Sequence, residues 1–272
     1  MTSIVGPALA AGLMIALTHA PLGIEVLKRG IIFIDLAVAQ VAGLGLVAAE
    51  ILLHEPLPWS MQTLALACAV AAGLFFRKIE KVMPEHQEAL IGVSFVLAAS
   101  LAILLLADHP HGGREIQYLL SGQMLFVTWT DVIHHAPIYG AILAAWFLKP
   151  VLRNGLGFYL IFALAITSSV QLVGVYVVFA SLILPALAAV KSGRPHITAW
   201  LCGILSVTMG IALSVLTDLP TGPVLVTSFT VTAIVLSNLY KFWLLSDSGL
   251  IDGMRKHSVT EPQPKIGTTK NN

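Results

Sequence analysis

Long apolar stretches alternate with short polar connections along nearly the whole chain. A helix that crosses the hydrocarbon core of a bilayer needs roughly 20 residues, and the stretches are of about this length. They therefore predict membrane helices, while the polar connections predict the turns at the two membrane surfaces. The predicted helices lie near residues 4–20, 31–53, 60–76, 89–107, 132–148, 158–173, 175–190, 196–216 and 223–245.

This pattern predicts an all-α fold, a polytopic membrane helix bundle with about eight or nine transmembrane helices and no large soluble domain. The transmembrane domain covers residues 1–245. Residues 246–272 are polar and contain Lys, Pro, Gly and Thr, a composition that buries too little apolar surface to fold. We expect this segment to be a disordered cytoplasmic tail.

Residues 158–190 depart from the simple pattern. They leave and re-enter the same membrane surface in about 33 residues, where two full spans need about 40. The two helices are therefore short or broken, with a turn near Val173 and Gly174. Transporters place such breaks along their pathways, where protein or a water-filled cavity covers the backbone. Residues 115–131 are too polar to span comfortably, so we place them in an outer or re-entrant helix.

The basic residues set the orientation of the chain. Of the 15 Lys and Arg residues, all except Arg114 fall on one side of the predicted membrane. By the positive-inside rule this side is cytoplasmic, which places the N-terminus outside and the C-terminus inside. The opposite connections contain Asp, Glu and His, a composition that would suit a divalent cation.

Composition excludes a soluble enzyme. The chain is 57% hydrophobic and 11% charged, whereas a soluble domain typically has about 25% charged residues. It has no Walker A, GxSxG, HExxH or CxxC sequence. Cys68 and Cys202 lie inside apolar stretches and imply no disulfide framework. Active transport would need an ion gradient or a separate ATPase subunit.

Polar side chains inside the predicted spans are the first candidates for a transport pathway, since burying them in a membrane is costly. Asp35 lies six residues after Arg29, roughly 9 Å along a helix. It either pairs with Lys28 or Arg29 near the interface or contributes to a pathway. Gln40 lies near the midplane, where its amide either bonds to a neighbouring helix or offers a carbonyl ligand.

Two groups near the outer surface could bind metal. Glu50 and His54 are four residues apart on one helix face, and a carboxylate with an imidazole suits Zn²⁺. An interfacial hydrogen bond is the alternative for this pair. The denser group is Asp108, His109 and His111 in a loop that contains glycine. This group would either collect metal outside the membrane or be an ordinary polar loop.

A segment on the cytoplasmic side could dock on a partner. A proline near the end of a short span can break its helix and start an interfacial helix. The alternative is a plain loop whose charges only orient the chain. The candidate docking residues are Pro185, Ala186, Lys191, Gly193 and Arg194.

Five short segments carry a family resemblance. They are Pro21-Leu22-Gly23 with the basic Lys28-Arg29, Glu88–Val93, Leu120–Gly122 with Val127-Thr128, Val173–Ala186, and Asp218–Pro223. In this order they resemble motifs of the inner-membrane permeases of zinc/manganese uptake ABC transporters. The resemblance covers about residues 20–240.

This resemblance implies a permease subunit in the bacterial inner membrane that is not itself an enzyme. It also implies a second copy of the chain, two cytoplasmic ABC ATPase subunits docking near residues 185–195, and a periplasmic or lipid-anchored protein that delivers metal. Transport would proceed by ATP-driven alternating access, with membrane lipid around the permease and no nucleic acid partner. No covalently bound cofactor is expected. The cargo would be Zn²⁺ first, which suits imidazole and carboxylate, and Mn²⁺ second.

One position departs from the family pattern. Familiar members place an Asp and a His four residues apart on the second span, and an alignment without gaps from Arg29 puts Leu36 and Gln40 there. Asp35 lies one residue earlier, which turns it by about 100° around the helix. Either Asp35 and Gln40 serve in a shifted register, or other groups pass the metal.

Two other classes of transporter are alternatives. A permease for an iron chelate or a vitamin would usually be longer and would favour aromatic residues along its pathway. A secondary carrier driven by protons or sodium would need dedicated intramembrane acids, for which Asp35 is the one candidate. Transport without ATPase partners would identify such a carrier. A membrane enzyme is the least favoured class, because no catalytic set of residues is present.

Overall fold

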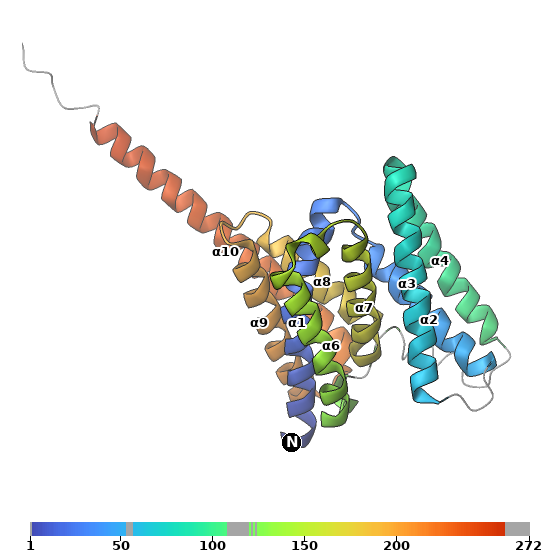
Figure 1. Cartoon of the computed structure of the whole chain (residues 1–272). Helices are drawn as coiled ribbons and strands as arrows, with labels where there is room; N and C mark the ends of the chain where they lie inside the picture. The colour runs from blue at the N-terminus through green and yellow to red at the C-terminus, as the bar shows by residue number, and fades with distance from the viewer. Residues whose placement is uncertain (1, 53–56, 108–119, 121, 123, 259–272) are drawn as a thin grey trace, which may run out of the picture.

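The structure is a computed structural model that describes residues 2–52, 57–107, 120, 122 and 124–258. Within these ranges the chain forms nine α-helices and three short 3-10 helices, and it contains no strand. Figure 1 shows the helices running roughly side by side in a bundle, from which α10 projects. The predicted all-α helix bundle is confirmed.

Each predicted apolar stretch corresponds to one helix. The α-helices are α1 (Thr2–Arg29), α2 (Ile34–Leu52), α3 (Pro58–Val82), α4 (Gln87–Leu105), α6 (Trp129–Leu148), α7 (Gly155–Val173), α8 (Val175–Ala189), α9 (Pro195–Thr217) and α10 (Thr221–Ser258). The 3-10 helices are η1 (Pro84–His86), η2 (Met124–Phe126) and η3 (Pro150–Arg153). Seven of the described helices are long and apolar enough to cross a membrane, while α8, with 15 residues, is short. The helix α6 is not among the seven.

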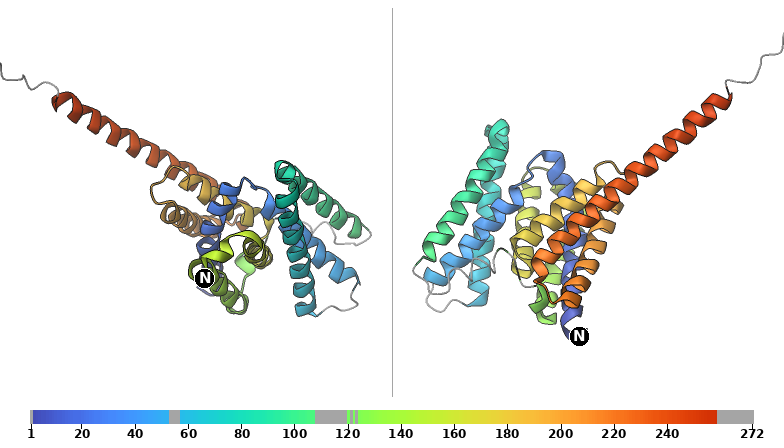
Figure 2. Two further views of the ribbon diagram at one scale, coloured as in Figure 1. Left: turned by 45° about the horizontal axis from the view of Figure 1, so that its top comes forward. Right: turned by 180° about the vertical axis from the view of Figure 1, so that it is seen from behind.

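The helices form two groups. In Figures 1 and 2, α2, α3 and α4 lie together on one side of the larger group formed by α1 and α6–α10. Within the larger group α1 packs against α8 and α9, and α10 packs against α8 and α9. The contact between α3 and α7 joins the two groups. Most of the buried apolar core is contributed by α1, α2, α7 and α8.

The ends of the helices follow the predicted charge asymmetry. The C-terminal ends of α1 and α3 and the α8–α9 connection lie at the end of the bundle opposite the N-terminus (Figure 1). The last turns of α1 and α3 are basic, with Lys28, Arg29 and Lys81. This end is the cytoplasmic end according to the positive-inside rule.

The predicted turn between two short helices is present. Helix α7 ends at Val173 and α8 begins at Val175. Gly174 between them has φ 78°, a left-handed conformation that glycine adopts without steric cost. The Leu120–Gly122 segment meets this turn, because a Cβ on Gly122 would lie 2.1 Å from the carbonyl oxygen of Val173. Two of the family-like motifs therefore contact each other.

Helix α1 continues beyond residue 20, where the predicted helix ended, and the break at Pro185 that was one alternative is not present. Pro21 lies inside α1, which continues to Arg29, and Pro185 lies inside α8, which continues to Ala189. The neighbours Leu22 and Ala186 are almost fully buried. Packing against adjacent helices holds the backbone helical past each proline, although each proline removes one hydrogen bond.

The C-terminal helix is longer than the predicted span. Helix α10 runs on to Ser258, so residues 246–258 are helical, whereas the sequence predicted a disordered tail from 246. Residues 259–272 lie outside the described residues. Of the predicted outer or re-entrant helix over 115–131, residues 115–119, 121 and 123 also lie outside them, and the described part includes the short η2 and the start of α6.

Candidate functional site

Asp35 is the most deeply buried acid in the described part of the chain. It lies in the first turn of α2, with 0% of its surface exposed. Neither carboxylate oxygen makes a hydrogen bond of ordinary geometry with a described residue. The groups that act on it electrostatically are the backbone N–H groups at the start of α2 and the Glu88 carboxylate. An acid without a cationic partner in such a place is costly for stability.

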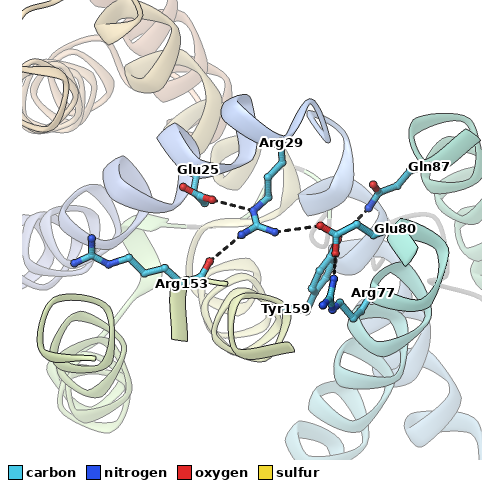
Figure 3. Close-up of polar contacts among 7 residues, drawn as sticks. All are labelled: Glu25, Arg29, Arg77, Glu80, Gln87, Arg153 and Tyr159. Carbon is cyan, nitrogen blue, oxygen red and sulfur yellow. Dashed lines mark hydrogen bonds and ion pairs between the residues drawn. The ribbon is translucent and has the colours of Figure 1, made fainter. Parts of the chain in front are cut away.

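The alternative in which Asp35 pairs with Lys28 or Arg29 is not realised. Arg29 instead donates through Nε to Glu25 at 3.0 Å and through Nη1 to Glu80 at 3.4 Å (Figure 3). Its Nη2 donates to the carbonyl oxygen of Arg153 at 2.8 Å. Glu25 is one turn earlier on the same helix, a spacing that brings its carboxylate next to the guanidinium, so Arg29 pairs with Glu25 and not with Asp35.

Figure 3 shows that this arginine network joins several helices at the cytoplasmic end. Glu80 of α3 also pairs with Arg77, one turn earlier on the same helix. The Arg29 guanidinium lies over the Phe158 ring of α7, 4.2 Å from its centroid. Gln87 of α4 donates to the Tyr159 hydroxyl of α7 at 3.0 Å. The network therefore links the α2–α4 group to the larger group.

Glu88 is a second carboxylate beside Asp35. It lies in the first turn of α4, and its Oε1 accepts a hydrogen bond from the backbone N–H of Phe33 at 3.2 Å. Its Oε2 is buried and makes no hydrogen bond with a described residue. Sequence reasoning quoted Glu88 as part of a motif but did not place it with Asp35. Only the packing of α4 on α2 brings the two acids together.

The other pathway candidates on α2 lie apart from this pair. Gln40 is half-buried five residues further along, roughly 140° around the helix from Asp35. Glu50 is exposed near the far end of α2. Leu36, which occupies the aligned family position, lines an apolar groove of about 790 Å³ between α2 and α4. The structure therefore groups Asp35 with Glu88, and not with Gln40 or Glu50.

Four of the predicted metal ligands cannot be placed. His54, the proposed partner of Glu50, lies outside the described residues. The same holds for Asp108, His109 and His111. Within the described residues no group of three or more His, Cys, Asp or Glu side chains could hold a metal ion.

Asp131, on the same outer side, has a structural partner. The backbone N–H and the hydroxyl of Thr128 donate to its carboxylate at 2.8 and 2.7 Å and cap the start of α6. These hydrogen bonds hold the pKa of the Asp131 carboxyl below its usual range.

A buried polar cluster lies in the middle of the larger helix group. The ring nitrogens of His19 lie 2.8 Å from Ser181 Oγ and 3.0 Å from Ser169 Oγ. Ser169 is also 2.8 Å from the hydroxyl of Tyr139. All four side chains are buried, and they come from α1, α6, α7 and α8. Sequence reasoning missed this cluster because its members lie far apart in the chain and only the packing of four helices brings them together.

The cytoplasmic docking candidates divide into two sets. Pro185 and Ala186 are buried inside α8. Lys191, Gly193 and Arg194 are exposed in the α8–α9 connection. Beside this connection is a groove of about 290 Å³ between α1 and the end of α8. It is lined by Ile24, Leu27, Lys28, Ala186, Ala189, Val190, Ser192 and Pro195.

These features define the class of the protein as a multi-pass helical membrane protein, with a buried acidic site and a basic end. The family profile of the ABC 3 transport family matches residues 1–154 and 150–240. The chain therefore belongs to the ABC 3 transport family, and the predicted resemblance to an ABC permease is confirmed.

Solved structures share this fold. PsaBC from Streptococcus pneumoniae in complex with Fab matches with a TM-score of 0.67 at 17% sequence identity, over 85% of this chain and 90% of that chain. An inward-facing conformation assigned to the metal-chelate type of ABC transporter matches with a TM-score of 0.55 at 16% identity. This second match covers 90% of this chain and 85% of that chain.

Proposed function

We propose that this chain is the permease subunit of an ATP-driven importer that moves a divalent metal ion across the bacterial inner membrane by alternating access. The observation that carries this proposal is Asp35, fully buried without a cationic partner, beside the half-satisfied Glu88. Membership of the ABC 3 transport family supplies the class of machine. The pair of acids, Asp35 and Glu88, is the reason for proposing a cation as the cargo.

The chemistry of the pair favours a divalent cation over a large organic ligand. Both oxygens of Asp35 and one of Glu88 are free to act as ligands. Carboxylate oxygens bind both Zn²⁺ and Mn²⁺, and a cation would offset the cost of burying the acids. We rank Zn²⁺ first and Mn²⁺ second, because the outer connections of the sequence add several imidazoles.

Partner subunits complete this machine. The chain has no nucleotide-binding motif, so the ATPase subunits are separate and dock at the cytoplasmic end. Exposed Lys191 and Arg194 and the apolar groove beside them suit such a contact. The apolar groove between α2 and α4 would face a second copy of the chain or lipid. An external binding protein would deliver the metal.

The test is uptake of radioactive Zn²⁺ or Mn²⁺ into proteoliposomes that contain this chain with its ATPase and binding protein. Asp35→Asn and Glu88→Gln should reduce ATP-dependent uptake strongly. Glu85→Gln is the matched control, because Glu85 is exposed in η1 three residues before Glu88. We expect this control to match the wild type.

Three outcomes would contradict the proposal. If wild-type vesicles take up neither metal in the presence of ATP, a divalent metal is not the cargo. Uptake of an iron chelate or a vitamin would then identify the cargo. Uptake that persists without the ATPase would indicate an ion-coupled carrier. Normal uptake by Asp35→Asn would exclude the acid pair from the pathway.

A further inference from the structure

A second polar site lies towards the outer end of the bundle, where α3, α6 and α7 meet. It is a cavity of about 90 Å³, far along α7 from the cytoplasmic end that holds Asp35. Three helices contribute side chains to its wall. The lining residues are Gln62, Leu66, His135, Ile138, Leu164, Thr167, Ser168 and Gln171.

Two hydroxyls in the wall of this cavity are buried, and the hydroxyl of Tyr139 interacts with that of Ser168. Thr167 and Ser168 are only 4% and 5% exposed. Neither hydroxyl makes a hydrogen bond of ordinary geometry with a described residue. Buried hydroxyls are nearly always satisfied, and leaving one unsatisfied is costly. The cavity has room for several water molecules, so a hydrated ligand can satisfy both groups.

His135 is oriented in the way that metal-binding histidines are. Its Nδ1 lies 2.9 Å from the backbone carbonyl oxygen of Asp131, which can only accept a hydrogen bond. Nδ1 therefore carries the proton, and Nε2 carries the lone pair. Histidines that bind metal commonly donate their second nitrogen to a carbonyl or carboxylate, which fixes the tautomer in this manner. The Thr128 cap holds Asp131 in place.

The remaining polar lining is made of neutral oxygen ligands. Gln62 and Gln171 offer amide oxygens, and Thr167 and Ser168 offer hydroxyls. Among the described residues no Lys or Arg lines the cavity, which argues against an anion. A neutral set of one imidazole and several oxygens suits a divalent transition-metal cation that keeps part of its water. Such a set binds weakly enough to release the ion, as a transport pathway requires.

We infer that this cavity is a transient outer site for a partly hydrated divalent transition-metal cation, with His135 Nε2 as its nitrogen ligand. The inference rests on the proposed function and adds a binding site that the ion reaches before Asp35. Polar groups continue inward from the cavity. Ser169, next to Ser168, contacts the Tyr139 hydroxyl and the His19 ring in the centre of the bundle.

The experiment uses the complete transporter in nanodiscs, with Mn²⁺ alone as the probe. Pulsed electron paramagnetic resonance detects ¹⁴N coupling when an imidazole binds Mn²⁺, and the same preparations are assayed for ATP-dependent uptake. The variants are His135→Ala and the nearly isosteric Thr167→Val. The control is His134→Ala, since His134 is the adjacent residue on α6 but is exposed and does not line the cavity.

We expect His135→Ala to remove a share of the ¹⁴N modulation and to raise the KM for uptake about tenfold with little change in kcat. Thr167→Val should weaken Mn²⁺ binding but keep the ¹⁴N coupling, whereas His134→Ala should match the wild type. If His135→Ala equals His134→Ala in both readouts, the cavity holds water only and the inference is overturned.

The two proposals can fail separately. If the wild-type transporter moves neither metal, the proposed function fails. The ¹⁴N signal of bound Mn²⁺ then shows by itself whether the cavity binds metal through His135. If uptake is normal in wild type and His135→Ala changes neither uptake nor the ¹⁴N signal, the importer stands and the outer site does not.

Discussion

Arg29 at the cytoplasmic end of α1 reaches Glu80 of α3, with 3.4 Å between Nη1 and Oε1. The side chains are 15% and 28% exposed, so the pair is only partly screened by solvent. It connects the larger helix group to the α2–α4 group that carries Asp35 and Glu88. A change in the relative position of the two groups must lengthen or break this contact.

Replacing Arg29 with Lys should loosen this connection. Lysine keeps the charge, but its compact ammonium cannot reach Glu25, Glu80 and the Arg153 carbonyl together as the planar guanidinium does. We expect a loss of about 1–3 kcal/mol of stability, seen as a lower melting temperature of the purified protein in nanodiscs. Lys81→Gln, at an exposed position on α3, is the control. Equal melting temperatures for the two variants would show that the network contributes little.

Replacing Asp35 with Asn should separate stability from activity. The variant removes a buried carboxyl that has no cationic partner in the described structure, so we expect it to be more stable by about 1 kcal/mol or more. Metal uptake should be lost at the same time. Thermal melting and uptake are measured on one preparation. An Asp35→Asn protein that melts lower than wild type would show that the carboxylate serves to hold the fold.

Removing the imidazole of His19 should destabilise the larger helix group. His19→Ala leaves the hydroxyls of Ser169 and Ser181 without their bridging partner and creates a cavity between α1, α7 and α8. The expected loss is about 2–4 kcal/mol in a melting experiment. His19→Gln can make part of these hydrogen bonds and should recover part of the stability. No difference between the two variants would indicate that volume alone matters at this position.

Gly23 should tolerate no side chain. A Cβ there would lie 2.0 Å from the carbonyl oxygen of Leu182, because α1 and α8 pack backbone against backbone at this point. Gly23→Ala must push the helices apart, and we expect a loss of about 1–3 kcal/mol. Gly140→Ala on α6 is the matched control, since a Cβ there meets no atom within 4 Å. The control should be neutral or slightly stabilising because alanine favours the helix.

Each helix in the apolar stretches could be predicted before the structure because hydropathy and length are local properties of the chain. The turn at Gly174 was predictable for the same reason, since 158–190 is too short for two full spans. A break at Pro185 was one of two alternatives and is not present, because a proline acts on its helix only as far as the surrounding packing allows. The proline by itself favours a break there, but the packing of α8 against α1 and α10 keeps the helix intact.

The sequence by itself determined the class of protein and the places of its apolar helices, through the spacing of apolar residues. The side on which the basic residues lie predicts the orientation of the chain. Only the tertiary structure decided that Asp35 meets Glu88 and that His19 meets Ser169. The physical reason is that these helices are apolar on almost every face. A helix without a polar face carries no signal of how it is rotated or which neighbour it contacts, so the polar partners emerge only when the helices pack.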